Sequence, residues 1–291
     1  MRLTHGQAVL GMLAVTLMWS TAGVVTRHLE HAARFEVTFW RSLFTVLSLL
    51  VILPMLRGRG VFARMLRAGP ALWASGLCWG VMFTAFMVAL TLTTVASVLV
   101  TMAVGPLLTA LVARMAIPGY RIPARTWGAI LVAGLGIAWM YGTQVAEGQL
   151  AGTLVALAVP LAAAINWAIA ERAHARGQDI DFVPAVLAGA VLSSLATLPL
   201  AMPFVATPRD LGLLAFLGLT QLAIPCALAV VCARVLKAPE VALLSLLEVV
   251  FGILWAWLGA GEAPGPTVLA GGVLVLGALV ANELIGWRQR R

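Results

Sequence analysis

Apolar stretches of about twenty residues recur along the whole chain, separated by short segments that carry charge, proline or glycine. Since a helix needs about 20 apolar residues to cross the hydrocarbon core of a bilayer, each stretch predicts a transmembrane helix. The segments around Thr93 and Gly261 are short, so we expect the helices on either side of each to be antiparallel neighbours. The predicted helices are 7–27, 36–56, 70–91, 95–116, 124–142, 150–171, 182–202, 210–232, 238–259 and 266–286.

Composition supports a single membrane unit. The chain is 62% hydrophobic and only 10% charged, against about 25% charged residues in an average soluble domain. Ten helices take up roughly 200 of the 291 residues, which leaves no room for a separate soluble domain. The fold class predicted is therefore an all-α membrane protein of ten transmembrane helices. Arg2 is followed by a long apolar run without a small-residue cleavage site, so this run reads as an uncleaved first helix.

The net charge of +8 is dispersed in short clusters between apolar runs. Because the basic residues form no single patch with interleaved aromatics, nucleic acid is not an expected partner. With the N-terminus in the cytoplasm, fifteen of the nineteen basic residues fall on the cytoplasmic side, and only Arg27, Arg34, Arg41 and Arg209 on the other. This bias predicts that both termini are cytoplasmic, which requires an even number of spans.

An internal repeat becomes visible when the chain is shifted against itself by 143 positions. We therefore predict two five-helix repeats, 1–143 and 144–291. Five is odd, so the second repeat must be inverted in the membrane, as in secondary transporters whose substrate site lies near the midplane between repeats. The aligned pairs are Gly105-Pro106 with Glu248-Val249, Pro123 with Pro266, Gly128 with Gly271 and Gly134 with Gly277, and Trp19 pairs with Trp167 at an offset of 148.

Several short motifs occur in a recognisable order: Trp19-Ser20, Arg41 after Trp40, Leu247-Glu248, and Gly261-Glu262 followed by Pro266 and Gly271. With these motifs the chain resembles the EamA-like branch of the drug/metabolite transporter superfamily, which implies ten helices in two inverted repeats. Within that family it is most similar to the aromatic amino acid exporters, which implies a carrier that moves amino acids out of the cell. The first repeat departs from the pattern, with Gly105 and Gly119 where the second has Glu248 and Glu262.

Ionisable groups inside a membrane are candidates for function because they are costly in hydrocarbon. Glu248 lies near the middle of the ninth predicted helix. It is either a site for a substrate amine or a proton, or a carboxyl group bonded to a neighbouring helix. Arg41 and Glu262 lie near predicted helix ends, where snorkelling and capping account for them.

Other candidates are polar, aromatic or proline residues within predicted helices. The small and hydroxyl residues Thr94, Ser97, Thr101, Gly105 and Thr109 form one stripe, which either permits close helix contact or lines a wet path. Deep aromatic residues either pack or contact a ligand, and deep amides either hold a zwitterion or bond across helices. Prolines at 106, 160 and 225 mark points where a helix frees backbone carbonyl groups, and these points either bind substrate or act as a hinge, or are kinks of packing alone. The predicted substrate-binding residues are Trp19, Ser20, Trp79, Phe83, Ser97, Thr101, Asn166, Trp167, Gln221, Ser245 and Glu248.

These observations favour a secondary transporter over two other classes. The chain has no phosphate-binding loop, and its histidines and aspartates are scattered, so we expect no catalytic residue, metal or cofactor. A membrane enzyme is disfavoured, while a facilitator or an exporter of other metabolites or drugs stays open. A cavity walled by Trp19, Trp79, Phe83 and Trp167 would suit neutral aromatic amino acids, and a single copy in the bilayer is sufficient.

One lysine against eighteen arginines, with abundant alanine, suggests a bacterium, and hence its inner membrane.

Overall fold

The structure is a computed structural model that describes residues 3–116, 123–146, 150–178, 180–236 and 238–288. Every regular element in these ranges is helical, which confirms the prediction of an all-helical chain. The helices are α1 (His5–Thr26), α2 (Arg34–Arg57), α3 (Val61–Leu66), α4 (Pro70–Leu92), α5 (Val95–Met102), α6 (Gly105–Ala116), α7 (Ala124–Ala146), α8 (Leu150–Ala156), α9 (Ala158–Ala175), α10 (Val183–Ala201), α11 (Pro208–Phe216), η1 (Leu217–Ala223), α12 (Ile224–Cys232), α13 (Ala238–Ala260) and α14 (Pro266–Arg288). The segment η1 is a π-helix.

Three of the predicted ranges are interrupted helices. The predicted range 95–116 contains two helices, α5 and α6. The range 150–171 corresponds to α8 and α9, and the range 210–232 corresponds to α11, η1 and α12 in succession. Pro106, Pro160 and Pro225 each lie in the first turn after an interruption. Proline cannot donate a backbone hydrogen bond and crowds the preceding turn, so a regular helix cannot continue through it. The prolines thus mark irregular points of the helices, as predicted, and the single helices expected there are divided into shorter segments. The short helix α3 was not predicted.

Eight helical segments of the described chain are long and apolar enough to cross a membrane. Two further long helices, α7 and α13, also belong to the bundle, and α13 contains the shorter apolar stretch Leu247–Ala260. Many large apolar side chains on these segments point outward, for example Leu10, Leu131 and Val273, each about 70% exposed. Such an outer surface is expected where lipid takes the place of water. The chain is therefore a multi-pass membrane protein.

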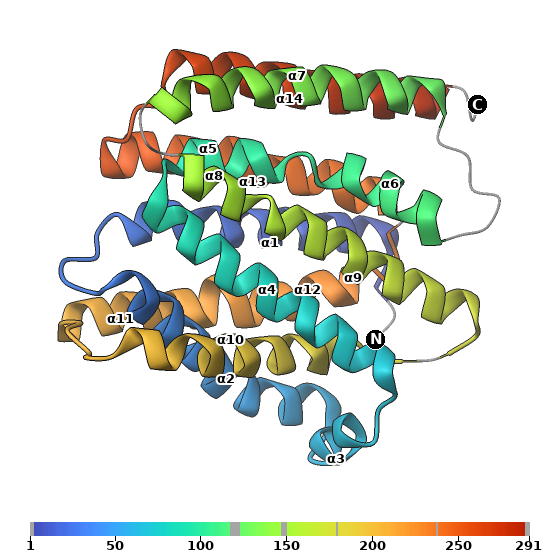
Figure 1. Ribbon diagram of the computed structural model, residues 1–291. Helices are drawn as coiled ribbons and strands as arrows, with labels where there is room; N and C mark the ends of the chain where they lie inside the picture. The colour runs from blue at the N-terminus through green and yellow to red at the C-terminus, as the bar shows by residue number, and fades with distance from the viewer. Residues whose placement is uncertain (1–2, 117–122, 147–149, 179, 237, 289–291) are drawn as a thin grey trace.

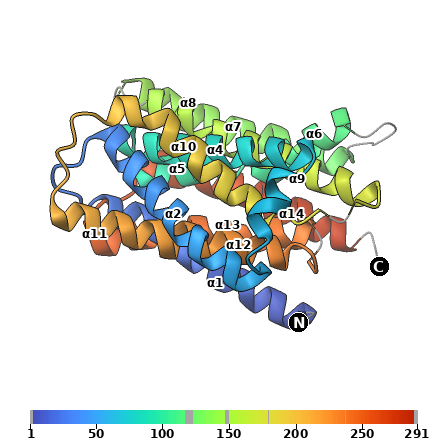
Figure 2. The same ribbon diagram turned by 90° about the horizontal axis from the view of Figure 1, so that it is seen from below.

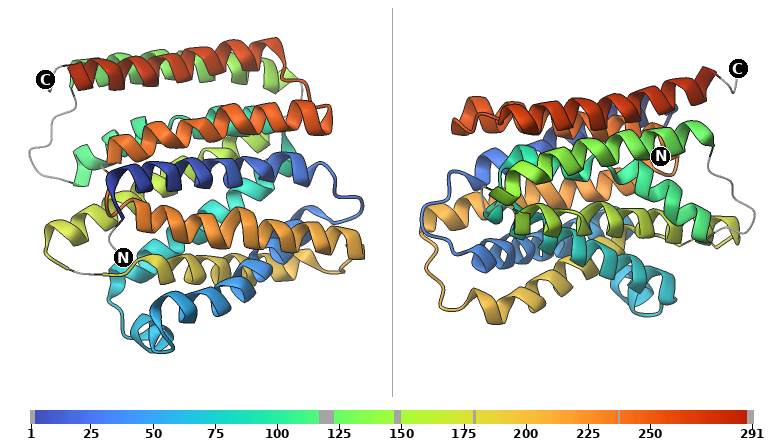
Figure 3. Two further views of the ribbon diagram at one scale, coloured as in Figure 1. Left: turned by 180° about the vertical axis from the view of Figure 1, so that it is seen from behind. Right: turned by 45° about the horizontal axis from the view of Figure 1, so that its top comes forward.

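The long helices run roughly along one axis, with α7 and α14 side by side at one edge of the bundle (Figures 1 and 3). The packing pattern repeats itself between the first and second parts of the chain. Helix α1 packs on α13 and α12, as α9 packs on α6 and α4. Helix α2 packs on η1, as α10 packs on α4. The pairs α2 with α10 and α7 with α14 join corresponding helices directly, as expected for two halves related by a pseudo-two-fold axis.

The paired helices α7 and α14 run in opposite directions (Figure 1). The start of α1 and the end of α14 lie at the same end of the bundle, together with α3 (Figures 1 and 2). We refer to this end as the terminal end. The segments 27–33, 202–207 and 261–265 lie at the other end, which we refer to as the opposite end.

Two buried carboxylates organise the loops at the opposite end. Glu36, in the first turn of α2, accepts hydrogen bonds from the backbone N–H groups of Val205 and Ala206. Asp210, in the first turn of α11, accepts from the backbone N–H groups of Glu30 and His31. Both side chains are fully buried. Each carboxylate lies at a helix N-terminus, where the helix dipole also favours negative charge, so each holds a loop from the other half of the chain.

Candidate functional site

A buried arginine lies in the interior of the bundle. The side chain of Arg41 on α2 has no exposed surface. Its Nη1 donates to Oε1 of Gln221 over 3.0 Å, and its Nη2 donates to the carbonyl oxygen of Phe83 over 2.7 Å. The guanidinium carbon lies 5.8 Å from the ring centre of Phe86, which is within the range of a cation–π interaction. Its Nε has no hydrogen-bond partner.

Close packing of α2 on the π-helix η1 brings Arg41 and Gln221 together. A β-carbon at Gly218 would lie 2.9 Å from the carbonyl oxygen of Arg41 and 2.7 Å from Cβ of Phe44, so only glycine permits this approach. Thr45 donates to both the Arg41 and Gly218 carbonyls. The extra residue in a π-helical turn rotates the following side chains, and such turns are frequent at functional sites. Gln221 lies in this segment and is 3% exposed.

The thiol of Cys226 is buried and interacts with Arg41 and with a second ionisable residue. It interacts electrostatically with both Arg41 and Glu248, and it contacts the side chain of Trp19. Glu248 on α13 is 9% exposed. Arg41 and Glu248 form no ion pair with each other, and no described residue donates a hydrogen bond to the Glu248 carboxylate. We name Trp19, Arg41, Phe83, Gln221, Cys226 and Glu248 the interior cluster.

Two aromatic residues of α4 extend the cluster. The rings of Trp79 and Phe83 contact each other at 5.5 Å between centres, and both side chains are almost fully buried. The indole Nε1 of Trp79 is buried without a hydrogen-bond partner. A buried donor left unpaired is unfavourable by about 1–3 kcal/mol and calls for an explanation. One explanation is an acceptor on a bound molecule.

Four of the predicted substrate-binding residues thus lie in the interior cluster, Trp79 adjoins it, and the others lie elsewhere. Asn166 accepts a hydrogen bond from Ser75 over 2.6 Å between α9 and α4. Ser20 accepts from Nε1 of Trp255 over 3.1 Å. Trp167 is half-buried on α9, and Ser245 is half-buried on α13. The amide of Asn166 therefore bonds across helices, which is one of the two roles its position allowed.

The predicted stripe on α5 and α6 is packed against neighbouring helices. Ser97 and Thr101 are fully buried. Thr101 donates to the carbonyl oxygen of Ser97, and Thr109 donates to that of Gly105. Helix α5 packs on α13, with Leu99 against Gly252. In this conformation the stripe permits close helix contact.

Two apolar grooves of the described chain lie on its outer surface. One, of about 350 Å³, lies between α4 and α9 and is lined by residues such as Leu77 and Leu161. The other, of about 340 Å³, lies between α13 and α14 beside Trp257. Apolar walls of this kind suit lipid chains. Neither groove includes a predicted substrate-binding residue.

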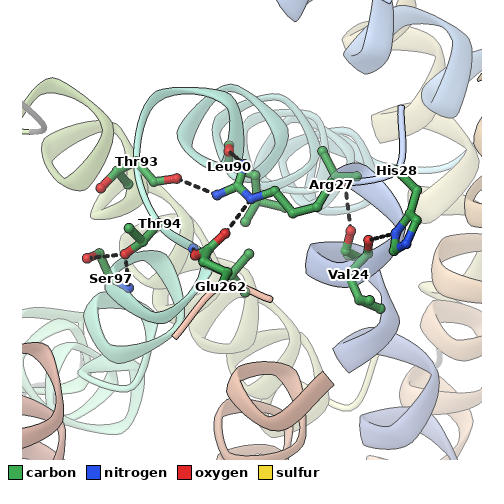
Figure 4. Close-up of polar contacts among 11 residues, drawn as sticks. Val24, Arg27, His28, Leu90, Thr93, Thr94, Ser97 and Glu262 are labelled. Carbon is green, nitrogen blue, oxygen red and sulfur yellow. Dashed lines mark hydrogen bonds and ion pairs between the residues drawn. The ribbon is translucent and has the colours of Figure 1, made fainter. Parts of the chain in front are cut away.

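A charged cluster joins the two halves at the opposite end (Figure 4). Arg27, which follows α1, forms an ion pair through its Nε with Glu262, between α13 and α14. Arg27 also donates to the carbonyl oxygens of Leu90 and Thr93, over 2.7 and 2.8 Å. The second oxygen of Glu262 accepts from the backbone N–H of Val95 over 2.6 Å. We name Arg27 and Glu262, with these three backbone groups, the Arg27–Glu262 clamp.

The prediction that Arg41 snorkels from a helix end was wrong, because its side chain is fully buried in the bundle. Arg41 is the eighth residue of α2, yet its side chain points into the bundle because it shares a buried polar face with Thr38, Ser42 and Thr45. That spacing of three and four residues was the available signal. Gln221 was predicted as a substrate-binding residue, but its hydrogen bond with Arg41 was not predicted. For Glu262, a role at a helix end was predicted, but its ion pair with Arg27 of the first half was not.

Comparisons with known proteins agree with this architecture. The model of the EamA-like transporter family matches twice, at residues 6–142 and 150–282, and each match falls within one of the two predicted repeats. No curated protein matches the sequence. Twelve chains of solved structures match. One, titled "Crystal structure of protein", is 18% identical, with 99% of this chain and 100% of that chain covered and a TM-score of 0.67, which shows a shared fold. With two family matches that together span most of its length, the chain belongs to the EamA-like transporter family.

Proposed function

We propose that this protein is a secondary transporter that exports neutral amino acids, with a preference for aromatic and other hydrophobic side chains. The family supports transport of small substrates across a membrane. The observation that carries the amino acid class is the interior cluster, where aromatic rings adjoin ionisable and amide groups. Flat rings favour an apolar side chain, and the polar groups suit the α-amino and α-carboxyl groups. Resemblance to aromatic amino acid exporters motivates the direction.

Alternating access between two inverted five-helix repeats, 1–143 and 144–291, is the proposed mechanism. The repeated packing pattern and the antiparallel pair α7 and α14 support the inversion. We propose ten spans with both termini in the cytoplasm of a bacterium, in its inner membrane. The shared location of the start of α1 and the end of α14 supports an even number of spans. The excess of arginine in segments of the terminal end, such as 57–67, supports the orientation.

Labelling from one side of the membrane tests the topology. Cysteines placed at Arg59 and at Arg288 should react only with reagents that reach the cytoplasm. A cysteine at Glu30, at the opposite end, should react from outside the cell. Reaction of the first two from opposite sides would contradict the even number of spans.

Substrate counterflow in liposomes tests the function. Liposomes that contain the purified chain and are loaded with unlabelled phenylalanine should take up labelled phenylalanine with saturable kinetics. Unlabelled tryptophan, methionine and leucine should compete better than aspartate or lysine. Flux that does not saturate would indicate a channel, and equal competition by charged and aromatic amino acids would contradict the proposed substrate class.

A further inference from the structure

The charge of Arg41 is neutralised by no carboxylate of the described chain. Its hydrogen-bond partners are the Gln221 amide and the Phe83 carbonyl, and the ring of Phe86 lies nearby. All three are uncharged. A guanidinium carries five N–H donors, and described residues accept only two hydrogen bonds from it. Ionisable side chains within membrane spans usually pair with one another or mark a substrate path. Arg41 is therefore equipped to bind an anionic group.

Glu248 supplies a carboxyl group that interacts with the same thiol, that of Cys226. Its carboxylate belongs to α13, in the second half of the chain, whereas Arg41 belongs to α2, in the first. Both side chains are buried, and both interact with the Cys226 thiol. They do not contact each other as an ion pair. Two buried groups of opposite character that act on one thiol, and form no ion pair with each other, can be bridged by a molecule that carries both an anion and a cation.

We propose that Arg41 binds the carboxylate and Glu248 the ammonium group of a zwitterionic amino acid. This proposal rests on the proposed function and names the residues that recognise its substrate class. Gln221 and the Phe83 carbonyl fix two arms of the guanidinium, which leaves the unpartnered Nε for a carboxylate oxygen. Trp19 adjoins Cys226, and Trp79 adjoins Phe83, so both rings lie within reach of a hydrophobic side chain of the same molecule.

Charge balance explains the expected selectivity for neutral amino acids. A zwitterion neutralises both buried groups and adds no net charge to the interior. A molecule with only one of the two charged groups leaves Arg41 or Glu248 unpaired. Sites built to bond a polar group discriminate strongly against analogues that lack it, because the buried partner is then left unsatisfied. An additional charge on the side chain would meet only aromatic rings.

Truncated ligands test the two halves of the proposal separately. Dissociation constants would be measured for the purified full chain with phenylalanine, with 2-phenylethylamine, which lacks the carboxylate, and with 3-phenylpropionate, which lacks the amine. Wild-type protein should prefer phenylalanine to either analogue by at least about tenfold. Glu248→Gln should abolish the preference over 3-phenylpropionate and keep that over 2-phenylethylamine. Arg41→Gln should do the reverse.

Matched controls come from exposed residues of the same charge outside the interior cluster. Arg34→Gln changes an exposed arginine on α2, and Glu30→Gln changes an exposed carboxylate, so both should keep the wild-type preferences. If Arg41→Gln does not fold, Gln221→Leu replaces it, since loss of the orienting amide should lower the preference over 2-phenylethylamine by at least about threefold.

The results separate failure of the proposal from failure of the proposed function. If phenylalanine binds and is transported but Glu248→Gln leaves both preferences unchanged, the residue assignment is overturned and the function stands. If none of the three ligands binds to the wild-type protein, the proposed amino acid substrate class is wrong, and the assignment of Arg41 and Glu248 is overturned as well.

Discussion

The Arg27–Glu262 clamp joins the two halves of the chain at the opposite end of the bundle, and Glu262→Gln should loosen it. Glu262 accepts two charge-assisted hydrogen bonds, one from Arg27 Nε and one from the Val95 N–H. These bonds join the segment after α1 and the hairpin between α4 and α5 to the segment between α13 and α14 (Figure 4). Glutamine keeps the size of the side chain but removes its charge, and its NH2 group faces one of the two donors.

The magnitude follows from the burial of the pair. Hydrogen bonds to charged groups contribute about 1.5–3 kcal/mol each. The two side chains are 27% and 19% exposed, so solvent screens part of this energy, and glutamine retains one acceptor. The expected loss is therefore about 1.5 kcal/mol, which corresponds to about a tenfold change in an equilibrium between closed and open forms of this end.

Cys226 provides a native reporter for that equilibrium. It is 1% exposed and lies in the interior cluster. In a protein with Cys78→Ala and Cys232→Ala, it would be the only thiol. Its rate of reaction with a membrane-impermeant maleimide added at the Glu262 side should rise about tenfold in Glu262→Gln, in line with the population shift.

A matched control lies at the same end. Glu30 pairs with Arg209, but the two side chains are 42% and 61% exposed, and exposed pairs of this kind contribute little. Glu30→Gln should therefore leave the labelling rate of Cys226 unchanged. If Glu262→Gln labels no faster than Glu30→Gln, the clamp does not control access to the interior.

Three further substitutions test individual contacts. Gly218→Ala should lower thermal stability by about 1–3 kcal/mol because its β-carbon meets α2, whereas Gly212→Ala, with open space around it, should not lower it. Glu36→Ala should destabilise the chain by about 2–4 kcal/mol in thermal unfolding, since the N–H groups of Val205 and Ala206 lose their charged acceptor. Trp19→Ala should raise the KM for phenylalanine counterflow at least about fivefold, whereas Trp73→Ala, 40% exposed on α4, should leave it unchanged.

The helices could be predicted from the sequence because their lengths and irregular points are determined mainly by neighbouring residues. A run of apolar residues fixes the length of a segment, and proline fixes where it is interrupted, as at Pro106, Pro160 and Pro225. The family followed from short motifs whose order survives in the sequence. The end of each predicted range lies within three residues of a helix end in the structure, apart from α7 and α9, which continue to Ala146 and Ala175.

The candidate site was harder to predict than the helices, because it depends on contacts between residues that are far apart in the sequence. Arg41 lies close enough to the start of α2 for its side chain to reach the membrane surface, and only the packing of η1 and α4 decides that it turns inward. Its acceptor on Phe83 is a backbone carbonyl, which no residue pattern identifies. The π-helix at Leu217–Ala223 carries no distinctive composition either.

Many of the polar contacts cross from one half of the chain to the other. At the terminal end, Asp181 pairs with Arg57. At the opposite end lies the Arg27–Glu262 clamp. Both pairs are partly exposed, and a movement of the halves that opens one end would break the pair at that end. Arg41 and Glu248 also belong to different halves, so an amino acid bound between them would hold the halves together at the centre while either end opens. Binding energy at the interior cluster can therefore offset the loss of an end contact, and it is this differential contact that allows a substrate to shift the conformational equilibrium.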